Sequence, residues 1–468
     1  MKRLFSNIGW LLGGRGFNAV MSLVYLYLAT NTLGLEQFGH FALIVALGQA
    51  ITGLANFQTW QFIVRWGAGE DAAAADAMGA ELSGPPPDLE NMRDATGFAI
   101  ALDMLAIGMG ACFAAIVVAT AQMWLPLPTE LMWLTFGYCI VSLLSIRSTP
   151  TGLLRLRFQY ATATAAEAVQ PAIRTAGAVL AFMFMPNVMG FIIAWAASEV
   201  AVAIALWFAA TRRNPIDLSA ISLRRIPAKH KDAWRFVWST NMSGTLTIAG
   251  KQVIILLVGT FGGAALAGGF RVASQLGQAL VSLAQTVSKA IFPELVHAKD
   301  NALVMARRMA NIAVVAGVIA VLVALFGGRW ALAVIAQDDF SAFYWAMVIL
   351  AIAGAVELVG ASLESLLVSA GRAGTAFLVR AVPTVLALVM LDAAIDWNGA
   401  KGAAFAVLGS SSLAVVGFYV AILNLQEIRI TVKSDTDPDA DPASNDISDN
   451  RPKPANDLGE TDHQPASP

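Results

Sequence analysis

The sequence predicts an all-α polytopic membrane protein with twelve transmembrane helices, arranged as two parallel-repeat six-helix lobes around a central cavity. Its 468 residues are 57% hydrophobic and only 13% charged, whereas soluble domains carry about 25% charged residues. Twelve apolar runs are long enough to cross a bilayer, which takes about 20 residues. A short motif also recurs in the two halves of the chain. These observations favour a membrane protein built from two related halves.

The apolar runs fall into two groups of six, separated by a basic segment. In the first half they cover residues 8–30, 38–64, 97–121, 131–148, 165–185 and 188–210. In the second half they cover residues 236–260, 266–292, 310–326, 343–367, 376–391 and 402–423. The predicted parts are an N-terminal six-helix lobe (1–210), a basic cytoplasmic linker (211–235), a C-terminal six-helix lobe (236–432) and a tail (433–468). The tail is acidic, rich in proline and poor in apolar residues, so we predict that it is disordered.

Lysine and arginine are distributed unequally between alternate loops. The linker alone holds seven of them. The other loops on the same predicted side hold Arg65, Arg93, Arg147, Arg155, Arg157, Lys299, Arg307, Arg308, Arg372 and Arg380. The opposite loops hold only Arg329 and Lys401. Because cytoplasmic loops carry the excess of positive charge, both termini are predicted to be cytoplasmic.

Part of the second run is repeated in the eighth. The motif Leu-Gly-Gln-Ala occupies residues 47–50 and again residues 276–279, which lie 229 positions later. At that offset Phe41 falls on Phe270, and just before it a Thr-x-Gly triplet ending at Gly34 lies near one ending at Gly262. Equivalent runs that match in the same orientation imply parallel repeats about an axis along the membrane normal.

One face of the eighth run is polar, although the run as a whole is apolar. Its members are Arg271, Gln275, Gln278, Ser282, Gln285 and Lys289. They recur every three or four residues, which places them on one face of an α-helix. A membrane-spanning helix with such a face, ending in cations, is expected to line a water-filled passage. Lys289 is also consistent with a side chain that reaches from the helix end to the membrane surface.

Three further runs carry polar faces, and none of these four runs contains Asp or Glu. Arg15 and Asn18 share a face of the first run, and Gln49 and Asn56 share a face of the second. Lys251 lies on the seventh run, four residues after Thr247 and eight after Ser243. Four helices with polar faces and only positive charge predict a cavity for an anionic substrate. Hydrogen bonding between helices is the structural alternative for such faces.

The remaining charged groups inside the runs allow two interpretations. Arg174 in the fifth run is a candidate anion ligand, but Glu199 in the sixth run is also a suitable ion-pair partner for it. Glu357 and Glu364 share one face of the tenth run. Pairing of these two acids with Arg174 or Arg380 is as consistent with the sequence as a role in proton coupling.

Catalytic and metal chemistry are not indicated. The four histidines are scattered, and no Cys or His spacing suits a metal. The glycines before Lys251 resemble a phosphate-binding loop, but the spacing is one residue too long and the segment is apolar. We therefore expect no enzyme activity, no cofactor and no nucleic-acid partner, and the coupling ion, proton or sodium, stays open.

Several short motifs carry a resemblance to a known family. They are Asn7-Ile8-Gly9-Trp10-Leu11, Leu33-Gly34-Leu35-Glu36-Gln37-Phe38-Gly39, Phe292-Pro293-Glu294 and the duplicated Leu-Gly-Gln-Ala. With them, residues 7–423 resemble the Wzx-type polysaccharide and O-antigen flippases. These form the polysaccharide-exporter branch of the multidrug/oligosaccharidyl-lipid/polysaccharide (MOP) flippase superfamily, which includes the MATE transporters.

The resemblance implies a monomeric, multi-pass protein of the bacterial inner membrane, whose first, second, seventh and eighth spans line the cavity. It implies alternating-access transport of undecaprenyl-diphosphate-linked oligosaccharide for surface or exopolysaccharide biosynthesis. Membrane lipid, a polysaccharide polymerase and a chain-length regulator are the implied partners. The diphosphate ligands would be Arg15, Arg174, Lys251, Arg271 and Lys289. The sugar ligands would be Asn18, Gln49, Asn56, Gln275, Gln278 and Gln285.

Two other functions stay open. A cation-coupled multidrug antiporter of the same superfamily would need a carboxylate facing the cavity, and the first and seventh runs contain none. A non-transporting scaffold for a polysaccharide synthase would use the basic linker and the acidic tail to dock partners. A reconstituted transport assay separates the scaffold from both transporters.

Overall fold

The computed structural model describes residues 2–67, 89–157, 159–212, 216–295, 302–336, 338–369 and 372–435. The chain divides into two compact units, Met1–Ala421 and Ile422–Pro468. Most of the predicted acidic tail lies outside the described residues. The division of the first unit into two six-helix lobes stays a prediction.

The described residues form helices and no strands, which confirms that the protein is all-α. Before the basic segment the helices are α1 (Lys2–Ala55), α2 (Trp60–Gly67), α4 (Leu89–Ala121), α5 (Met132–Leu144), α6 (Ser148–Leu156), α7 (Tyr160–Glu167), α8 (Val169–Phe184) and α9 (Val188–Thr211). The later helices are α10 (Arg225–Lys229), α11 (Ala233–Leu295), α12 (Ala302–Ile335), α13 (Tyr344–Ser369), α14 (Ala373–Val389) and α15 (Leu391–Asp435). Short 3₁₀ turns η1 (Thr129–Leu131), η2 (Leu218–Ala220) and η3 (Asp338–Phe343) lie between them.

The predicted apolar runs lie mostly within these helices. Within the described residues, eight helical stretches are long and apolar enough to cross a membrane. The two longest helices, α1 and α11, each contain two predicted runs joined through a kink. The number of membrane crossings and the side of the termini stay predictions.

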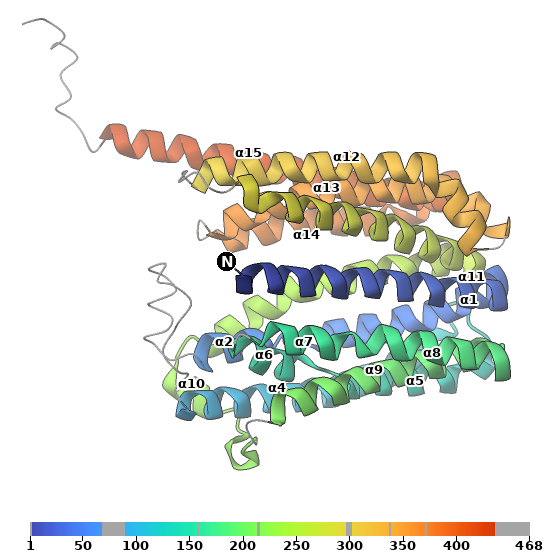
Figure 1. Ribbon diagram of the computed structural model, residues 1–468, viewed down its shortest axis with the longest axis horizontal. Coiled ribbons are helices and arrows are strands. Elements are labelled where there is room, and N and C mark those ends of the chain that lie inside the picture. Colours follow the sequence, from blue (N-terminus) through green and yellow to red (C-terminus); the bar gives the residue numbers. More distant parts are fainter. Residues whose placement is uncertain are drawn as a thin grey trace, which may run out of the picture. The chain divides into compact units, whose positions relative to one another are not determined.

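Helices that are distant in the sequence lie side by side in the first unit. The long helices α1 and α11 pack against each other, α8 packs on α9, and α12 packs on α13. Figure 1 shows α12, α13 and α14 grouped together, and α4, α5, α8 and α9 grouped together. The largest apolar core includes residues of both α1 and α11.

The kinks of α1 and α11 are equivalent positions of the sequence repeat. They occur at Gly34, with φ of 67°, and at Gly263, with φ of 83°. Residues with a Cβ atom rarely adopt a positive φ because of steric clashes, whereas glycine adopts it without steric cost. The two glycines are 229 residues apart, the offset of the Leu-Gly-Gln-Ala motif. The partner of Gly34 is therefore Gly263 rather than Gly262, because the Thr-x-Gly match is one residue out of register.

The helices α1 and α11 cross closely just after these kinks. A Cβ atom at Gly39 would overlap the backbone carbonyl of Ala264, and one at Gly268 would lie 2.8 Å from the carbonyl oxygen of Leu35. Leu35 corresponds to Ala264, and Gly39 to Gly268, at the offset of 229. The two contacts are therefore reciprocal, as expected for duplicated segments that meet about a two-fold axis. We call this contact the glycine crossing.

The glycines of the repeated motif have a packing role. A Cβ atom at Gly48 would overlap the ring of Tyr138 on α5. One at Gly277 would lie 3.2 Å from the backbone of Ala351 and of Met347 on α13. Each motif therefore brings its helix close to a neighbour, while Gln49 stays half-buried and Gln278 is exposed.

Two helices of the first half are interrupted where the sequence predicted continuous runs. The chain leaves the helical path between α1 and α2 and again between α5 and α6. Asp103 of α4 joins the two interruptions, because it accepts hydrogen bonds from Thr59 (3.0 Å) and Thr149 (2.6 Å). Thr59 immediately precedes α2 and Thr149 lies in the first turn of α6, so Asp103 holds the starts of the two helices together.

Replacement of Asp103 with alanine is expected to destabilise the protein. Asp103 is 7% exposed, and its removal leaves two buried threonine hydroxyls with fewer partners. The loss is expected to be about 2–3 kcal/mol of unfolding free energy, measured by chemical unfolding in detergent. Asp103→Asn keeps one acceptor oxygen and should lose less. Equal stability of the alanine variant and the parent would contradict this role.

The end of the basic segment is held by its own chain. Asp94 of α4 pairs with Arg225 at 3.2 Å and with Lys229 at 2.8 Å. The hydrogen bond to Asp94 raises the pKa of Lys229. Arg93 pairs with Asp217 at 2.6 Å. Part of the predicted linker therefore docks on α4 through ion pairs.

Candidate functional site

The polar face predicted from the eighth run lies on the second part of α11. Arg271 and Gln275 are half-buried, and Gln278 is exposed with its amide 3.4 Å from Ser274. The side chains of Ser282, Gln285 and Lys289 lie outside the described residues. The same applies to the Arg15 side chain on α1.

The predicted sugar ligands of the first half differ in position. Asn18 is exposed on α1 and accepts a hydrogen bond from Ser22 at 3.5 Å. Asn56 lies after the end of α1, and its side chain accepts from the backbone N–H of Gln58 at 3.0 Å. Asn56 is therefore not on a helical face with Gln49. It stabilises the turn that separates α1 from α2, a role typical of asparagine.

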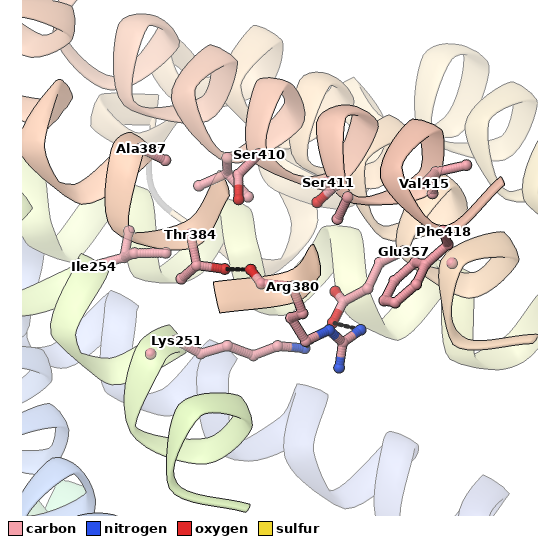
Figure 2. Close-up of a pocket in the computed structure, with 14 residues that line it drawn as sticks. Lys251, Ile254, Glu357, Arg380, Thr384, Ala387, Ser410, Ser411, Val415 and Phe418 are labelled. Atoms are coloured by element: carbon pink, nitrogen blue, oxygen red, sulfur yellow. Dashed lines mark hydrogen bonds and ion pairs between the residues drawn. The ribbon is translucent and has the colours of Figure 1, made fainter. Parts of the chain in front are cut away.

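Lys251 belongs to a cluster of four charged residues. Its ammonium lies 3.4 Å from Glu357 of α13, and Arg380 of α14 lies 3.2 Å from Glu364. Arg380 also approaches Glu357 at 4.0 Å. We call these residues the Lys251 cluster. Figure 2 shows the Lys251 side chain reaching from α11 toward Arg380 and Glu357.

The Lys251 cluster borders a cavity of about 110 Å³ between α11, α13, α14 and α15. Lys251, Glu357 and Arg380 line it together with the hydroxyl groups of Thr384, Ser410 and Ser411. The sequence left the pairing of both glutamates with Arg174 or Arg380 open beside a role in proton coupling, and it did not show that Lys251 shares Glu357. The hydroxyl residues were missed, although three consecutive serines (410–412) in an apolar run were a usable signal.

Arg174 is also paired. Its guanidinium lies 3.3 Å from Glu199, and the same carboxylate binds Arg147 at 2.8 Å. The guanidinium carbon of Arg174 lies 3.6 Å from the ring centre of Trp195, within the range of a cation–π interaction. The pairing with Glu199 that the sequence allowed is therefore present. One carboxylate is shared by two arginines, so this group keeps a positive charge.

Arg271 has a different environment. It donates a hydrogen bond to Gln252 at 2.9 Å, and no carboxylate among the described residues lies within ion-pair distance of it. Its guanidinium lies within electrostatic range of Tyr25, Tyr138 and Arg174. At the repeat offset its counterpart is Ala42, which is 1% exposed. The first half therefore places no equivalent cation there.

Three buried polar atoms of the first half have no hydrogen-bond partner among the described residues. They are the hydroxyls of Tyr25 and Tyr138 and the indole Nε1 of Trp195. A buried donor without a partner costs about 1–3 kcal/mol, and native proteins contain few such groups. We call Tyr25, Tyr138, Trp195, Arg174 and Arg271 the donor cluster. Tyr25 lies seven residues after Asn18 and therefore on the same helical face of the first run. Tyr138 and Trp195 appeared in the sequence as ordinary aromatic residues of apolar runs.

Metal binding has no support from the side chains. Within the described ranges, no group of three or more His, Cys, Asp or Glu side chains could hold a metal ion. Hydrogen-bond donors and cations dominate both the donor cluster and the face of α11. That composition suits an anionic ligand.

Known proteins resemble this chain in sequence and in fold. The family described as polysaccharide biosynthesis protein matches residues 4–299. The inner membrane protein YghQ of Escherichia coli K12 is 27% identical over 311 residues, which cover 63% of this chain and 81% of that protein.

Two solved structures show the fold. One is an inward-facing multidrug resistance MATE family transporter of the MOP superfamily, with a TM-score of 0.65, 14% identity and coverage of 88% and 96% of the two chains. The other is the lipid II flippase MurJ in an inward closed conformation, with a TM-score of 0.58, 11% identity and coverage of 88% and 87%. These matches confirm the resemblance that the sequence motifs carried. The chain is a multi-pass membrane protein that belongs to the polysaccharide biosynthesis protein family and has the fold of the MOP superfamily.

Proposed function

We propose that this protein is a flippase that moves polyprenyl-diphosphate-linked oligosaccharides across the bacterial inner membrane. One observation carries the proposal: Arg271 is a cation beside the interface of α1 and α11 without a carboxylate partner among the described residues. An uncompensated charge in a membrane protein is costly unless a ligand or water accepts it. The polysaccharide family and the flippase-like fold support a lipid-linked saccharide as that ligand.

The chemistry of Arg271 suits a diphosphate. Guanidinium groups form paired, charge-assisted hydrogen bonds with phosphate oxygens. The hydrogen bond to Gln252 fixes the guanidinium and leaves other N–H groups available. Because Arg271 is half-buried, the attraction between the two charges is stronger than at an exposed surface. Arg271 is therefore the main diphosphate ligand in our proposal.

Lys251 is the secondary ligand. Its side chain is 46% exposed and its distance to Glu357 is 3.4 Å, so the pair is weak and water-accessible. A phosphate group of the substrate can therefore take the place of Glu357 as the partner of Lys251, because only the weak Lys251–Glu357 ion pair is lost. Gln49, Gln275 and Gln278 offer amides to sugar hydroxyls, and the polyprenyl chain stays in the lipid.

Transport by alternating access requires the two halves to move against each other. The glycine crossing is a close contact between them, at reciprocal positions of the repeat. If the two helices separated at the glycine crossing, a passage would open beside the kinks of α1 and α11. The substrate is held meanwhile by side chains farther along the same two helices.

Replacement of Lys251 with methionine is expected to reduce transport by about threefold to tenfold. Transport should fall because the variant lacks the secondary cation that binds the phosphate group. The unfolding temperature should barely change, because the only ion pair that is lost is weak and exposed and is worth up to about 1 kcal/mol. Initial flipping rates in proteoliposomes measure the effect. Glu357→Gln is the matched variant, and it should raise substrate affinity because it frees Lys251. A loss of transport as large as that of an Arg271 variant would contradict the secondary role.

A multidrug antiporter is the second candidate, since the chain shares its fold with MATE transporters and Glu357 faces a cavity. A scaffold has less support, because Arg225 and Lys229 of the basic segment already form ion pairs with Asp94 of the same chain instead of facing a partner protein. The deciding experiment reconstitutes the full chain and measures two activities: flipping of a fluorescent polyprenyl-diphosphate oligosaccharide and ion-driven uptake of a cationic dye. Flipping alone supports the proposal, dye uptake alone supports the antiporter, and neither activity supports the scaffold.

A further inference from the structure

An apolar groove of about 520 Å³ lies between α5 and α9, apart from the residues discussed so far. Its floor holds small buried side chains, since Ser145 is 6% exposed and Ala203 is 7% exposed. Its rim is made by the larger side chains Leu144, Val200, Ile204, Trp207 and Phe208. Among them Leu144, Ile204 and Phe208 are each at least 62% exposed, so the groove is open to the surroundings.

The groove forms where α5 gives way to α6. The helix α5 ends at Leu144 and α6 begins at Ser148, whereas α9 packs on both and continues to Thr211. Between the end of α5 and the last turns of α9, the small side chains of Ser145 and Ala203 leave space that a larger residue would fill. The groove is therefore a consequence of the interruption between α5 and α6.

The polar side chains that line the groove already have partners in their own helices. The Ser145 hydroxyl donates to the carbonyl oxygen of Val141 at 2.7 Å, and the Thr211 hydroxyl donates to that of Trp207 at 2.8 Å. A sugar or an ion in the groove would lose its hydration and gain little in return. A hydrocarbon chain has no such cost, so it is the guest that suits the groove.

A cation lies at one end of the groove. Arg212 follows α9 directly and is exposed. Its guanidinium carbon lies 5.7 Å from the ring centre of Phe208, which lines the groove, and this distance is within the range of a cation–π interaction. In the part of the chain that the structure describes, no carboxylate lies within ion-pair distance of Arg212. The apolar groove therefore ends beside an exposed positive charge.

The length of the groove matches one leaflet of a bilayer. Along α9 its lining extends from Val200 to Thr211, which corresponds to about 17 Å at 1.5 Å per residue. Half of the hydrocarbon core of a bilayer is about 15 Å thick. Since α9 is long and apolar enough to cross the membrane, a hydrocarbon tail in the groove and a headgroup at Arg212 correspond to one phospholipid of a single leaflet.

We propose that this groove binds one acyl chain of an anionic phospholipid, whose headgroup phosphate pairs with Arg212. Guanidinium groups bind phosphate oxygens through paired, charge-assisted hydrogen bonds, and cations next to a membrane helix attract anionic lipids. We call this the lipid groove. It contains none of the residues assigned to the transported substrate, so the inference does not depend on the proposed function.

Quenching of tryptophan fluorescence by brominated acyl chains measures occupancy of the lipid groove. Trp207 lines it, and the difference between the full-length parent and Trp207→Phe isolates the signal of Trp207 from that of the other tryptophans. Brominated phosphatidylglycerol, titrated into delipidated protein in detergent, should quench Trp207 saturably. Its affinity should be about fivefold higher than that of phosphatidylcholine with the same chains, because one cation near the membrane surface contributes about that factor.

Two further ligands separate the acyl chain from the phosphate. Brominated lysophosphatidylglycerol, which has one chain, should also saturate the lipid groove. Glycerol phosphate, which has none, should not compete with it. Competition by glycerol phosphate would overturn the proposal, because the site would then bind the anion without the chain.

Three variants test the two ends of the lipid groove. Arg212→Gln should lower the affinity for phosphatidylglycerol about fivefold, to that of phosphatidylcholine. Ala203→Phe fills the floor and should abolish saturable quenching by both lipids; if this variant does not fold, Arg212→Gln still decides the question. Arg329→Gln is the matched control, because the Arg329 guanidinium also lies over an aromatic ring, that of Tyr344 at 5.1 Å, and it should bind like the parent.

Three results would overturn the proposal. The first is equal affinity of the parent for the two lipids, or equal affinity of the parent and Arg212→Gln for phosphatidylglycerol. The second is quenching of Trp207 that rises with lipid content without saturation, which indicates ordinary contact with bulk lipid. The third is displacement of the brominated lipid by an equal amount of polyprenyl diphosphate, which assigns the groove to the tail of the transported substrate.

Discussion

Replacement of Arg271 with alanine is expected to reduce flipping by between about thirtyfold and a few thousandfold. The removal of one partner of a buried, hydrogen-bonded charge pair costs about 2–5 kcal/mol, and each 1.4 kcal/mol corresponds to a factor of about ten. The unfolding temperature should stay the same or rise, since the described residues give Arg271 no carboxylate to leave unpaired. Initial rates in proteoliposomes and thermal unfolding in detergent measure both effects.

Two matched variants sharpen this experiment. Arg271→Lys keeps the charge but loses the planar fork that binds two phosphate oxygens, so it should be intermediate. Arg329→Ala removes an exposed arginine of α12, whose guanidinium lies over Tyr344 at 5.1 Å, and it should flip normally. Full transport by Arg271→Ala at normal protein level would refute the assignment of Arg271 as the diphosphate ligand.

Alanine at either position of the glycine crossing is expected to reduce flipping by about tenfold or more. A methyl group at Gly39 overlaps the Ala264 carbonyl, and one at Gly268 meets the backbone of Leu35 and Gly39. Because interiors are close-packed and backbone cannot be displaced easily, the closed contact becomes unfavourable. Both variants should shift the population toward an open crossing, and their effects should be similar because the positions are reciprocal.

Thiol labelling measures this shift. Ala267 is fully buried next to the crossing, and Ala267→Cys in a background without Cys112 and Cys139 should react slowly with a maleimide. Addition of Gly39→Ala or Gly268→Ala should accelerate labelling by about tenfold. Gly108→Ala is the control, since a Cβ atom there meets no atom within 4 Å. Unchanged labelling in both crossing variants would contradict the role of the crossing as a closed gate.

Much of the fold was predictable because membrane segments carry a strong apolar signal. The predicted runs lie mostly in helix, and the repeat offset read from the Leu-Gly-Gln-Ala motif relates both kinks and both crossing glycines. The breaks before α2 and α6 were not predicted. They depend on Asp103, which lies more than 40 residues away from either break, and local apolarity contains no information on such a partner.

The site was predictable only in part, because ion pairing is a tertiary property. The cation of Arg271 was identified from helical spacing, but the sequence could not show which arginines and lysines already have a carboxylate. Lys251 and Arg174 both proved to be paired, through Glu357 and Glu199. Tyr138 and Trp195 were overlooked because an aromatic residue in an apolar run is usually core packing. Only the absence of a hydrogen-bond partner distinguishes them.

The glycine crossing also constrains how this chain can evolve. Each glycine fits against backbone supplied by the other half, so neither half can change its crossing surface without a matching change in the other. Arg271 and Ala42 are also equivalent positions of the repeat, but they hold different residues. Chimaeras that exchange one half with a distant relative should therefore fail at the crossing before they fail in substrate choice.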